Sequence, residues 1–215
     1  MARDAHPLFA RYYARASLTM ERGIAGHRRT LLAGLSGRVI EVGAGNGLNF
    51  AHYPPEVTGV LAVEPEPHLR RIARENAEHA PVPVEVVDGT AGHLPVDDQS
   101  CDAAIASLVL CTVPDPGQAL AEVWRVLKPG GQLRFFEHVR SPSTALHRIQ
   151  RLLDATVWPT LGGGCHTGRD TEAAITNAGF VIERLDRLSS AATQIPFPAS
   201  PQILGIAVRP GGPPS

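Results

Sequence analysis

The chain has 215 residues, of which 43% are hydrophobic and 19% are charged, and its formal net charge at pH 7 is -1. This balance predicts one globular domain, 1–215, with a full-sized core and no charge surplus for binding nucleic acid or an anionic membrane. The three cysteines, Cys101, Cys111 and Cys165, form no C-x-x-C pair. Their scatter argues against a disulfide framework and a zinc knuckle and favours a reducing compartment, so we expect a cytoplasmic protein.

No segment of the sequence has the pattern of a membrane signal. Charged residues such as Arg3 and Asp4 come too early for a signal peptide. The longest uncharged apolar run, 103–113, is shorter than the roughly 20 residues that a transmembrane helix needs. We therefore expect a soluble chain without a membrane span.

The first element expected is a helix over 7–29, in which Tyr12, Tyr13 and Ala16 belong to an apolar pattern at helical spacing. Two interpretations of segment 1–35 are open. It packs on the core as an ordinary amphipathic helix, or it forms a lid whose tyrosines close over a ligand. The lid hypothesis places Tyr12 and Tyr13 in a substrate pocket.

A glycine-rich turn follows the first expected strand, 38–42, whose β-branched apolar residues indicate a buried parallel strand. Gly43, Gly45 and Gly47 have the spacing G-x-G-x-G, which lets the backbone approach a ligand closely. The dinucleotide fingerprint would instead place its third glycine one residue later, where Leu48 stands.

A carboxylate closes the second expected strand, 57–63. Glu64 lies 17 positions after Gly47, near the spacing at which an acidic residue binds ribose hydroxyls. The glycine turn and this carboxylate together predict a ligand that carries a ribose, and we expect an adenosyl group.

The rest of the chain alternates between helical and strand patterns. The expected helices cover 48–52, 67–80, 116–127 and 171–178, and the expected strands cover 82–87, 102–106, 132–136, 180–188 and 203–208. Segment 141–168 departs from this rhythm, and we interpret it as a flap inserted beside the site. The end of the chain, 209–215, is rich in proline and glycine and is expected to be disordered.

This alternation predicts an α/β fold in which a mostly parallel sheet is covered by helices on both faces. In such doubly wound sheets, ligands lie outside the carboxyl ends of the strands. Polar residues at the expected strand ends should therefore surround one crevice. They are Glu41, Glu64, Asp88, Ser107, Glu137 and His138.

Several motifs resemble the class I S-adenosylmethionine-dependent methyltransferases. They are 41–47 (E-V-G-A-G-N-G), Glu64, Ser100-Cys101-Asp102 and 125–131 (R-V-L-K-P-G-G). Further segments are similar to the methyltransferase-like branch of alkyl-thiol S-methyltransferases. They are Asn49-Phe50, 52–55, 108–113, 136–139, and Gly164-Cys165 with Arg169. Members of that branch carry an N-terminal membrane anchor for which we find no counterpart in this sequence, so no role at a membrane is carried over.

The resemblance implies a Rossmann-like, seven-stranded sheet with its last strand antiparallel, and S-adenosylmethionine as cofactor. It implies that Gly43, Gly45 and Gly47 approach the methionine and ribose parts, and that Glu64 binds the ribose 2′ and 3′ hydroxyls. The expected cofactor-binding residues are Glu41, Gly43, Ala44, Gly45, Gly47, Glu64, Pro65, Thr90, Ala91 and Ser107.

Two parts of this set have open alternatives. Glu41 binds the ammonium end of the cofactor or an ordered water, or it only caps the loop as a carboxylate at a strand end. Many relatives place an aspartate after the third strand, where it bonds the adenine amine. This chain has Gly89-Thr90-Ala91-Gly92 there, so either Thr90 accepts a weaker hydrogen bond or Asp88 reaches the adenine instead.

His138 is the candidate catalytic residue, because it follows the fifth expected strand and could take a proton from an acceptor. The alternative is a core histidine bonded to backbone. Cys111 and Cys165 are candidates for the substrate pocket, and Cys111 could equally be a small buried hydrophobe. Cys165 and His166 suggest a metal pair, but two adjacent ligands with no third nearby make a poor site, so we expect no metal.

We therefore expect a small-molecule methyltransferase that aligns an acceptor for in-line displacement, and a small thiol methylated on sulfur is the expected acceptor. The alternative within this class is C- or O-methylation of a quinone-like or phenolic compound. A nicotinamide-dependent oxidoreductase is a rival from another class, and Leu48 and the Lys-Pro-Gly-Gly turn count against it. The intact glycines and Glu64 count against a binding protein without activity.

Overall fold

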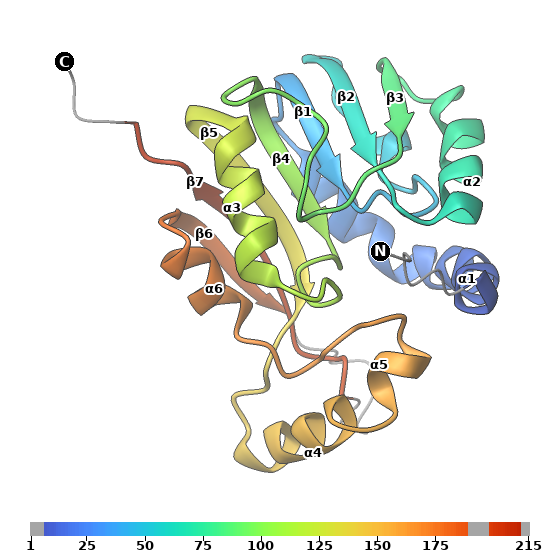
Figure 1. Ribbon diagram of the computed structural model, residues 1–215, viewed down its shortest axis with the longest axis vertical. Helices are drawn as coiled ribbons and strands as arrows, with labels where there is room; N and C mark the ends of the chain where they lie inside the picture. The colour runs from blue at the N-terminus through green and yellow to red at the C-terminus, as the bar shows by residue number, and fades with distance from the viewer. Residues whose placement is uncertain (1–6, 189–197, 212–215) are drawn as a thin grey trace.

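A seven-stranded sheet forms the centre of the computed structural model, which describes residues 7–188 and 198–211 (Figure 1). The strands are β1 (Gly37–Val42), β2 (Val57–Val63), β3 (Val84–Val87), β4 (Cys101–Ser107), β5 (Leu127–His138), β6 (Val181–Leu188) and β7 (Gln202–Val208). Their order is β3-β2-β1-β4-β5-β7-β6; β1 to β5 pair in parallel, and β7 is antiparallel to both neighbours. The predicted mostly parallel sheet with an antiparallel last strand is confirmed.

Helices cover both faces of the sheet (Figure 1). They are α1 (Pro7–Leu32), the short 3-10 helix η1 (Phe50–His52), α2 (Pro67–Ala77), α3 (Pro116–Val126), α4 (Thr144–Asp154), α5 (Trp158–Leu161) and α6 (Thr171–Asn177). Side chains of α3 and α6 join the buried cluster on one face, and those of α1 and α2 join the cluster on the other. This is the doubly wound arrangement that the sequence predicts.

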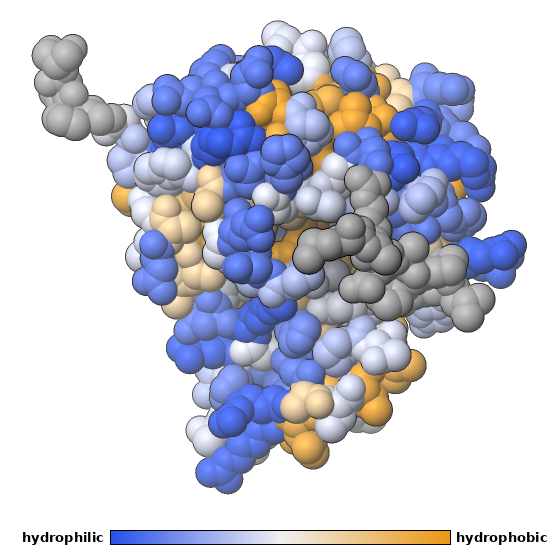
Figure 2. Space-filling view, viewed as in Figure 1, coloured by the Kyte–Doolittle hydropathy of each residue, from blue (hydrophilic) through white to orange (hydrophobic). Residues whose placement is uncertain are grey.

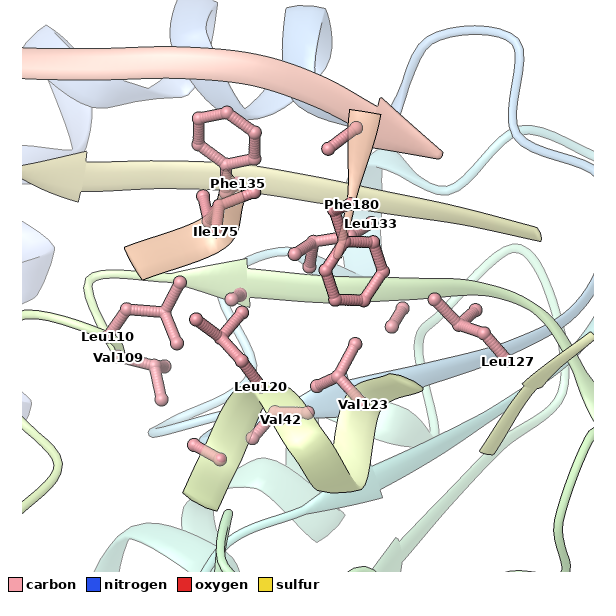
Figure 3. Close-up of a cluster of buried hydrophobic side chains, with 14 of the residues drawn as sticks. Val42, Val109, Leu110, Leu120, Val123, Leu127, Leu133, Phe135, Ile175 and Phe180 are labelled. Carbon is pink, nitrogen blue, oxygen red and sulfur yellow. The ribbon is translucent and has the colours of Figure 1, made fainter. Parts of the chain in front are cut away.

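The two clusters follow from the alternation of side chains along each strand. In β1, Ile40 faces the cluster under α3 and its neighbour Val39 faces the cluster under α1. Figure 3 shows the first cluster, in which Leu120 of α3 packs over the sheet beside Phe135 and Phe180. Fully burying one such side chain stabilises the fold by about 1.5–3 kcal/mol, so these layers fix the strand ends that carry the site.

Several element ends shift by one to three residues from the predictions, and two differences have a clear physical reason. The helix expected over 48–52 is only the single turn η1, because the prolines at 54 and 55 stop it. The strand expected to start at 132 starts at Leu127, so the Lys-Pro-Gly-Gly segment belongs to β5 and not to a separate turn. The reason is pairing with the end of β7, since Gly130 N–H donates to the Arg209 carbonyl (2.8 Å) and Arg209 N–H donates to Gly131 (2.9 Å).

Arg209 also anchors the start of the segment that we expected to be disordered. Its Nη1 donates to the Trp124 carbonyl (2.7 Å), and its guanidinium lies 5.1 Å from the Trp124 ring centroid. The described part of this segment therefore begins with a fixed residue, and 212–215 lie outside the described residues.

The Ser-Cys-Asp and Lys-Pro-Gly-Gly motifs meet at the amino ends of β1, β4 and β5, away from the predicted crevice. Asp102 accepts hydrogen bonds from the Arg38 backbone N–H (2.8 Å) and from Lys128 Nζ (2.6 Å). A Cβ on Gly37 would clash with the Asp102 carboxylate, so only glycine fits beside it. These motifs hold strand starts together and do not belong to the site.

The predicted flap, 141–168, leaves the sheet after β5 and carries α4 and α5 at the lower end of the molecule in Figure 1. Gln150 of α4 is fully buried and holds the flap to its base. Its Oε1 accepts the Ser141 N–H (2.8 Å), and its Nε2 donates to the carbonyls of Val139 (3.1 Å), Thr167 (3.0 Å) and Pro198 (2.9 Å). One amide therefore links both ends of the flap to Pro198, in the turn that precedes β7.

The outer side of the flap exposes apolar side chains. Figure 2 shows hydrophobic residues gathered where Figure 1 places α4 and α5, and the exposed ones include Leu152 and Leu161. No helix in 7–188 or 198–211 is long and apolar enough to cross a bilayer.

We expect Gln150→Ala to lower the free energy of unfolding by about 2–4 kcal/mol, because it leaves buried backbone groups without partners. Urea titration followed by circular dichroism measures the change. Arg148→Ala, an exposed position on the same helix, is the control and should stay within about 0.5 kcal/mol of the wild type. Equal stability of the two variants would show that Gln150 does not hold the flap.

Candidate active site

The glycine turn after β1 leaves one stretch of backbone open. Gly43, Gly45 and Gly47 all have positive φ (63°, 59° and 78°). A Cβ on Gly43 would lie 2.7 Å from Val109 Cγ2, whereas a Cβ on Gly45 would have only the Tyr13 ring, at 3.6 Å, within 4 Å. The turn is thus packed tightly beneath Gly43 and is accessible at Gly45, as a cradle for a ligand requires.

Glu64 lies at the end of β2 and is 5% exposed. Its Oε2 accepts the Gly45 N–H (2.7 Å), its Oε1 accepts the Glu66 N–H (2.9 Å), and Ala44 N–H donates to the Val63 carbonyl (3.1 Å). The carboxylate retains lone pairs for two hydroxyl donors, since its four acceptor sites are half used. Burial raises the pKa of Glu64 to about 7, against the opposing effect of these two amides.

The Glu41 carboxylate is buried and bound on both oxygens by side chains of the chain itself. Asn49 Nδ2 donates to Oε1 (2.8 Å) and the Tyr53 hydroxyl donates to Oε2 (2.7 Å). Arg28 of α1 donates in turn to Asn49 Oδ1 (2.8 Å). These are the loop-capping contacts that the sequence left open as an alternative, and the contact of Glu41 with the cofactor stays a prediction.

Ser107 ends β4 with a buried hydroxyl that has no partner among the described residues. An unpaired buried hydroxyl costs free energy that a polar ligand atom would recover. The next residue, Leu108, has φ +60°, a conformation that is rare without glycine. Together these features fit the predicted role of Ser107 as a cofactor-binding residue.

The residues predicted for the adenine end lie after β2 and β3. Arg70 Nη1 donates to the carbonyls of Glu64 (2.7 Å) and Pro65 (3.0 Å) and to Asp88 Oδ1 (3.1 Å), so Asp88 is engaged in an ion pair. Thr90 is exposed and forms an isolated bridge with His93, and Ala91 packs half-buried on the core under α3. Asp88 and Thr90 were the two candidates for bonding the adenine amine. Asp88 is engaged by Arg70, whereas Thr90 forms no ion pair.

The two tyrosines of the predicted lid point in different directions. Tyr13 is half-buried against Gly45, and its pKa is raised by burial and further by the charges of Glu64 and Cys111. Tyr12 is 66% exposed. Adjacent residues of a helix cannot share a face, so the structure brings only Tyr13 into the crevice.

A carboxylate that the sequence analysis did not single out shapes the loop after β4. Glu137 of β5 is fully buried, and its oxygens accept the backbone N–H groups of Val109 (3.0 Å), Leu110 (2.9 Å) and Cys111 (3.0 Å). Burial raises the pKa of Glu137 well above its ordinary value, and the three amides oppose that shift. The only sequence signal was its position at a strand end.

The structure brings Cys111, His138 and Cys165 together from three separate segments. His138 Nδ1 lies 3.5 Å from Cys165 Sγ and 3.7 Å from Cys111 Sγ, and the two sulfurs are 3.8 Å apart. Both cysteines are buried and His138 is half-buried. We expected no further metal ligand near Cys165, and this expectation is wrong. Cys111 and His138 lie far from Cys165 in the sequence but close to it in the fold.

His166, the residue paired with Cys165 in the sequence analysis, does not join this cluster. Its Nδ1 faces the Gly164 carbonyl (2.8 Å) and lies 3.3 Å from Arg169 Nη2. The hydrogen bond between the two thiols raises the pKa of Cys111 to about 12, with burial adding to it, and lowers the pKa of Cys165. Cys165 is therefore the thiol that loses its proton first.

Residues 40–135 match the family described as methyltransferase domain. The chain is 37% identical over 187 residues to the thiol S-methyltransferase TMT1B of Rattus norvegicus, which covers 83% of this chain and 74% of that protein. It is 32% identical over 216 residues to the thiol S-methyltransferase TMT1A of Homo sapiens, which covers 94% of this chain and 86% of that protein. This chain belongs to the class I S-adenosylmethionine-dependent methyltransferases. As a family member, the enzyme uses S-adenosylmethionine as its methyl donor.

Solved structures agree on the fold. A SAM-dependent methyltransferase from Thermotoga maritima has a TM-score of 0.62 at 23% identity, covering 94% of this chain and 99% of that one. The [4+2]-cyclase SpnF has a TM-score of 0.65 at 22% identity, covering 88% and 81%. These identities support the fold alone. The accessible Gly45, the lone pairs of Glu64 and the unpaired Ser107 hydroxyl fit the family's cofactor.

We expect the affinity for S-adenosylmethionine to rise with pH up to about 7 and then to level off. Ribose hydroxyls donate to the ionised carboxylate of Glu64, whose pKa in the ligand-free protein is about 7, so binding below that pH must release a proton. The gain approaches tenfold per pH unit well below the pKa. Calorimetry between pH 5.5 and 8 measures it.

Glu64→Gln is the matched control for this prediction, because glutamine keeps the shape and does not titrate. Its affinity should be lower, by about 1–3 kcal/mol at pH 8, and should lose the component of the pH dependence that comes from position 64. Identical pH profiles for the wild type and Glu64→Gln would contradict the assignment of Glu64 to the ribose.

Tyr13→Ala should weaken cofactor binding or slow methyl transfer at least tenfold, whereas Tyr12→Ala should leave both within about twofold. The reason is that only the Tyr13 ring lies against Gly45 and close to Glu64. Calorimetry and initial rates test the pair side by side. If the two variants behave alike, α1 is packing and not a lid.

Proposed function

We propose that this enzyme transfers the methyl group to the sulfur of a small thiol. The observation that carries the proposal is its likeness to thiol S-methyltransferases over 74–86% of their length. The site supports it, because soft sulfur and imidazole groups gather at the carboxyl ends of β4 and β5. A small thiol fits an acceptor position beside such groups better than a large polymer would.

The cofactor supplies a methyl group that is already activated, so the protein's task is to align an acceptor and to favour its thiolate. Arg169 places a positive charge near the sulfurs of Cys111 and Cys165. Arg169 donates to the carbonyls of Leu110 (2.7 Å) and Val113 (2.6 Å), and its charge couples to those of Cys111 and Cys165. A positive charge at this position favours an anionic sulfur nucleophile.

The base role predicted for His138 stays a prediction. The His138 Nδ1 atom contacts the sulfurs of Cys111 and Cys165, so in this structure its neighbours are thiols of the protein. Burial favours the neutral imidazole, but the hydrogen bond and charge of Cys111 outweigh it and raise the pKa of His138. The position is thus suited to stabilising sulfur anions.

Methylation of a quinone-like compound is the second candidate function. The demethylmenaquinone methyltransferase of Deinococcus radiodurans is 31% identical over 128 residues, covering 58% of this chain and 53% of that protein. The thiol S-methyltransferases share a longer part of the chain, so the thiol is favoured.

We also propose a cytoplasmic location for the enzyme. The three cysteines are free and buried, which fits a reducing compartment. Reduced thiols are also what the proposed acceptor chemistry needs.

The function is tested by incubating the enzyme with labelled S-adenosylmethionine and a matched panel of an alkanethiol, a thiophenol, a phenol and a hydroquinone. We expect thioether products, with rates at least 100-fold above those of the phenol. Mass spectrometry identifies the methylated atom. Faster transfer to the phenol or the hydroquinone would overturn the thiol assignment and leave the cofactor assignment intact.

A further inference from the structure

We propose that Cys111, His138 and Cys165 form a zinc site of the Cys2His type whose open fourth position takes the thiolate of the acceptor. The three ligand atoms are Cys111 Sγ, His138 Nδ1 and Cys165 Sγ. The zinc site is argued from the distances between these three atoms. The role of its fourth position rests on the proposed thiol methylation.

The distances between the three ligand atoms match the edges of a zinc tetrahedron. Zinc binds thiolate sulfur at about 2.3 Å and imidazole nitrogen at about 2.0–2.1 Å, which at tetrahedral angles separates two sulfurs by about 3.8 Å and a sulfur from a nitrogen by about 3.5–3.6 Å. The sulfurs of Cys111 and Cys165 are 3.8 Å apart, and His138 Nδ1 lies 3.5 and 3.7 Å from them. The three ligand atoms therefore already have the spacing that a tetrahedral zinc ion requires.

The backbone around the three ligands is fixed by contacts that do not involve the ligand atoms. Glu137, the neighbour of His138, binds the Cys111 N–H, and the Cys111 carbonyl accepts the His166 N–H (2.7 Å) beside Cys165. Arg169 then joins the flap to the Leu110 carbonyl (2.7 Å). Such outer contacts hold metal ligands in place before the metal arrives.

The charges around the cluster suit a divalent cation that binds two thiolates. Zinc balances the two thiolates of Cys111 and Cys165, and the remaining charged neighbours, Glu137 and Arg169, are of opposite sign. Asp154, whose charge also couples to Cys165, accepts hydrogen bonds from the backbone N–H groups of 167 and 168. Zinc and Arg169 thus place three positive charges beside the four negative charges of the two thiolates, Glu137 and Asp154, and backbone N–H groups stabilise the Asp154 carboxylate.

Within the described ranges, this group offers three protein ligands and no fourth histidine, cysteine or acidic side chain. Three protein ligands with one open position are typical of catalytic zinc, whereas structural zinc has four. The cluster lies near the cofactor turn, because Val109, two residues before Cys111, packs on Gly43, and the charges of Glu64 and Cys111 both act on Tyr13.

The chemistry balances without a redox partner. On entering the fourth position the acceptor thiol gives its proton to water, and its sulfur stays as a thiolate. The sulfur electron pair forms the bond to the methyl carbon while the bond between that carbon and the sulfonium sulfur breaks. The product is a neutral thioether, which is a weaker zinc ligand than a thiolate and leaves. In this arrangement His138 is a ligand and not a base.

Two alternatives to the zinc site are a metal-free cluster held by hydrogen bonds between the thiols and the imidazole, and a disulfide between Cys111 and Cys165. The sulfurs are 3.8 Å apart, far beyond the roughly 2.05 Å of a disulfide, and both cysteines are free. Metal content separates the hydrogen-bonded cluster from the zinc site.

The first experiment measures zinc by inductively coupled plasma mass spectrometry in the full chain, purified under reducing conditions from zinc-supplemented cells. We expect about one zinc per wild-type chain and less than about a tenth in Cys111→Ser, Cys165→Ser and His138→Ala. Cys101→Ala, which changes the third cysteine, and His166→Ala, the neighbour that turns away, are matched controls and should retain the zinc. Circular dichroism checks that each variant is folded.

The second experiment uses the wild-type chain, stripped of zinc and loaded with cobalt in the absence of oxygen. We expect the visible bands of tetrahedral cobalt and a thiolate-to-cobalt charge-transfer band. Adding ethanethiol should increase that band by about half, since a third thiolate joins two. Ethanol and dimethyl sulfide at the same concentration are the controls and should not increase it.

Three outcomes would overturn the proposal. The zinc site is disproved if the wild-type chain binds neither zinc nor cobalt, or if the three ligand variants retain zinc. A mass lower by two hydrogens in the reduced preparation shows a disulfide in its place. Cobalt bands that do not respond to ethanethiol remove the role of the fourth position. The activity panel separates these results from the proposed function, because a zinc-free enzyme that still methylates thiols would keep the function and lose the site.

Discussion

The loop that follows β4 depends on one buried interaction, the Glu137 carboxylate bound by three consecutive backbone N–H groups. Burying a carboxylate costs several kcal/mol, and the charge-assisted bonds from residues 109 to 111 offset that cost. Leu108, directly before these amides, has a positive φ of 60°, and the three hydrogen bonds that follow help to hold this rare conformation.

This loop joins the two halves of the site. At one end Val109 packs so closely on Gly43 that no side chain fits there, which fixes the position of the cofactor turn. At the other end Cys111 is held beside His138 by the carboxylate that precedes the histidine. One short piece of backbone thus connects the glycine turn with the Cys111–His138–Cys165 cluster, where we propose that the acceptor binds.

The sequence predicted that the glycine turn and Glu64 would meet, for a physical reason. Gly43 and Glu64 each follow an apolar strand directly, and the carboxyl ends of parallel strands meet at one edge of the sheet. Tyr12 could not be separated from Tyr13 in the same way, because the orientation of α1 depends on tertiary packing. Glu41 satisfied its burial with Asn49 and Tyr53, partners that no local pattern indicates.

Cys111, His138 and Cys165 were each singled out from the sequence, but their convergence into one cluster could not be predicted, because they meet only in the folded chain. Cys165 is 54 positions from Cys111 and 27 from His138, and it reaches them through a flap that has no regular βα pattern. Local spacing therefore pointed to His166, which the fold turns toward Gly164 and Arg169. A search for sulfur and imidazole groups at the ends of neighbouring strands would have paired Cys111 with His138.

The division between these halves also explains why the fold does not name the reaction. The [4+2]-cyclase SpnF has a TM-score of 0.65 to this chain and the Thermotoga maritima methyltransferase one of 0.62, so the fold alone does not decide the chemistry. What distinguishes this enzyme lies beyond the ends of β4 and β5, where Glu137 sets the loop and Gln150 and Arg169 hold the flap against it. Under the proposed function, those contacts decide which side chains stand opposite the methyl group.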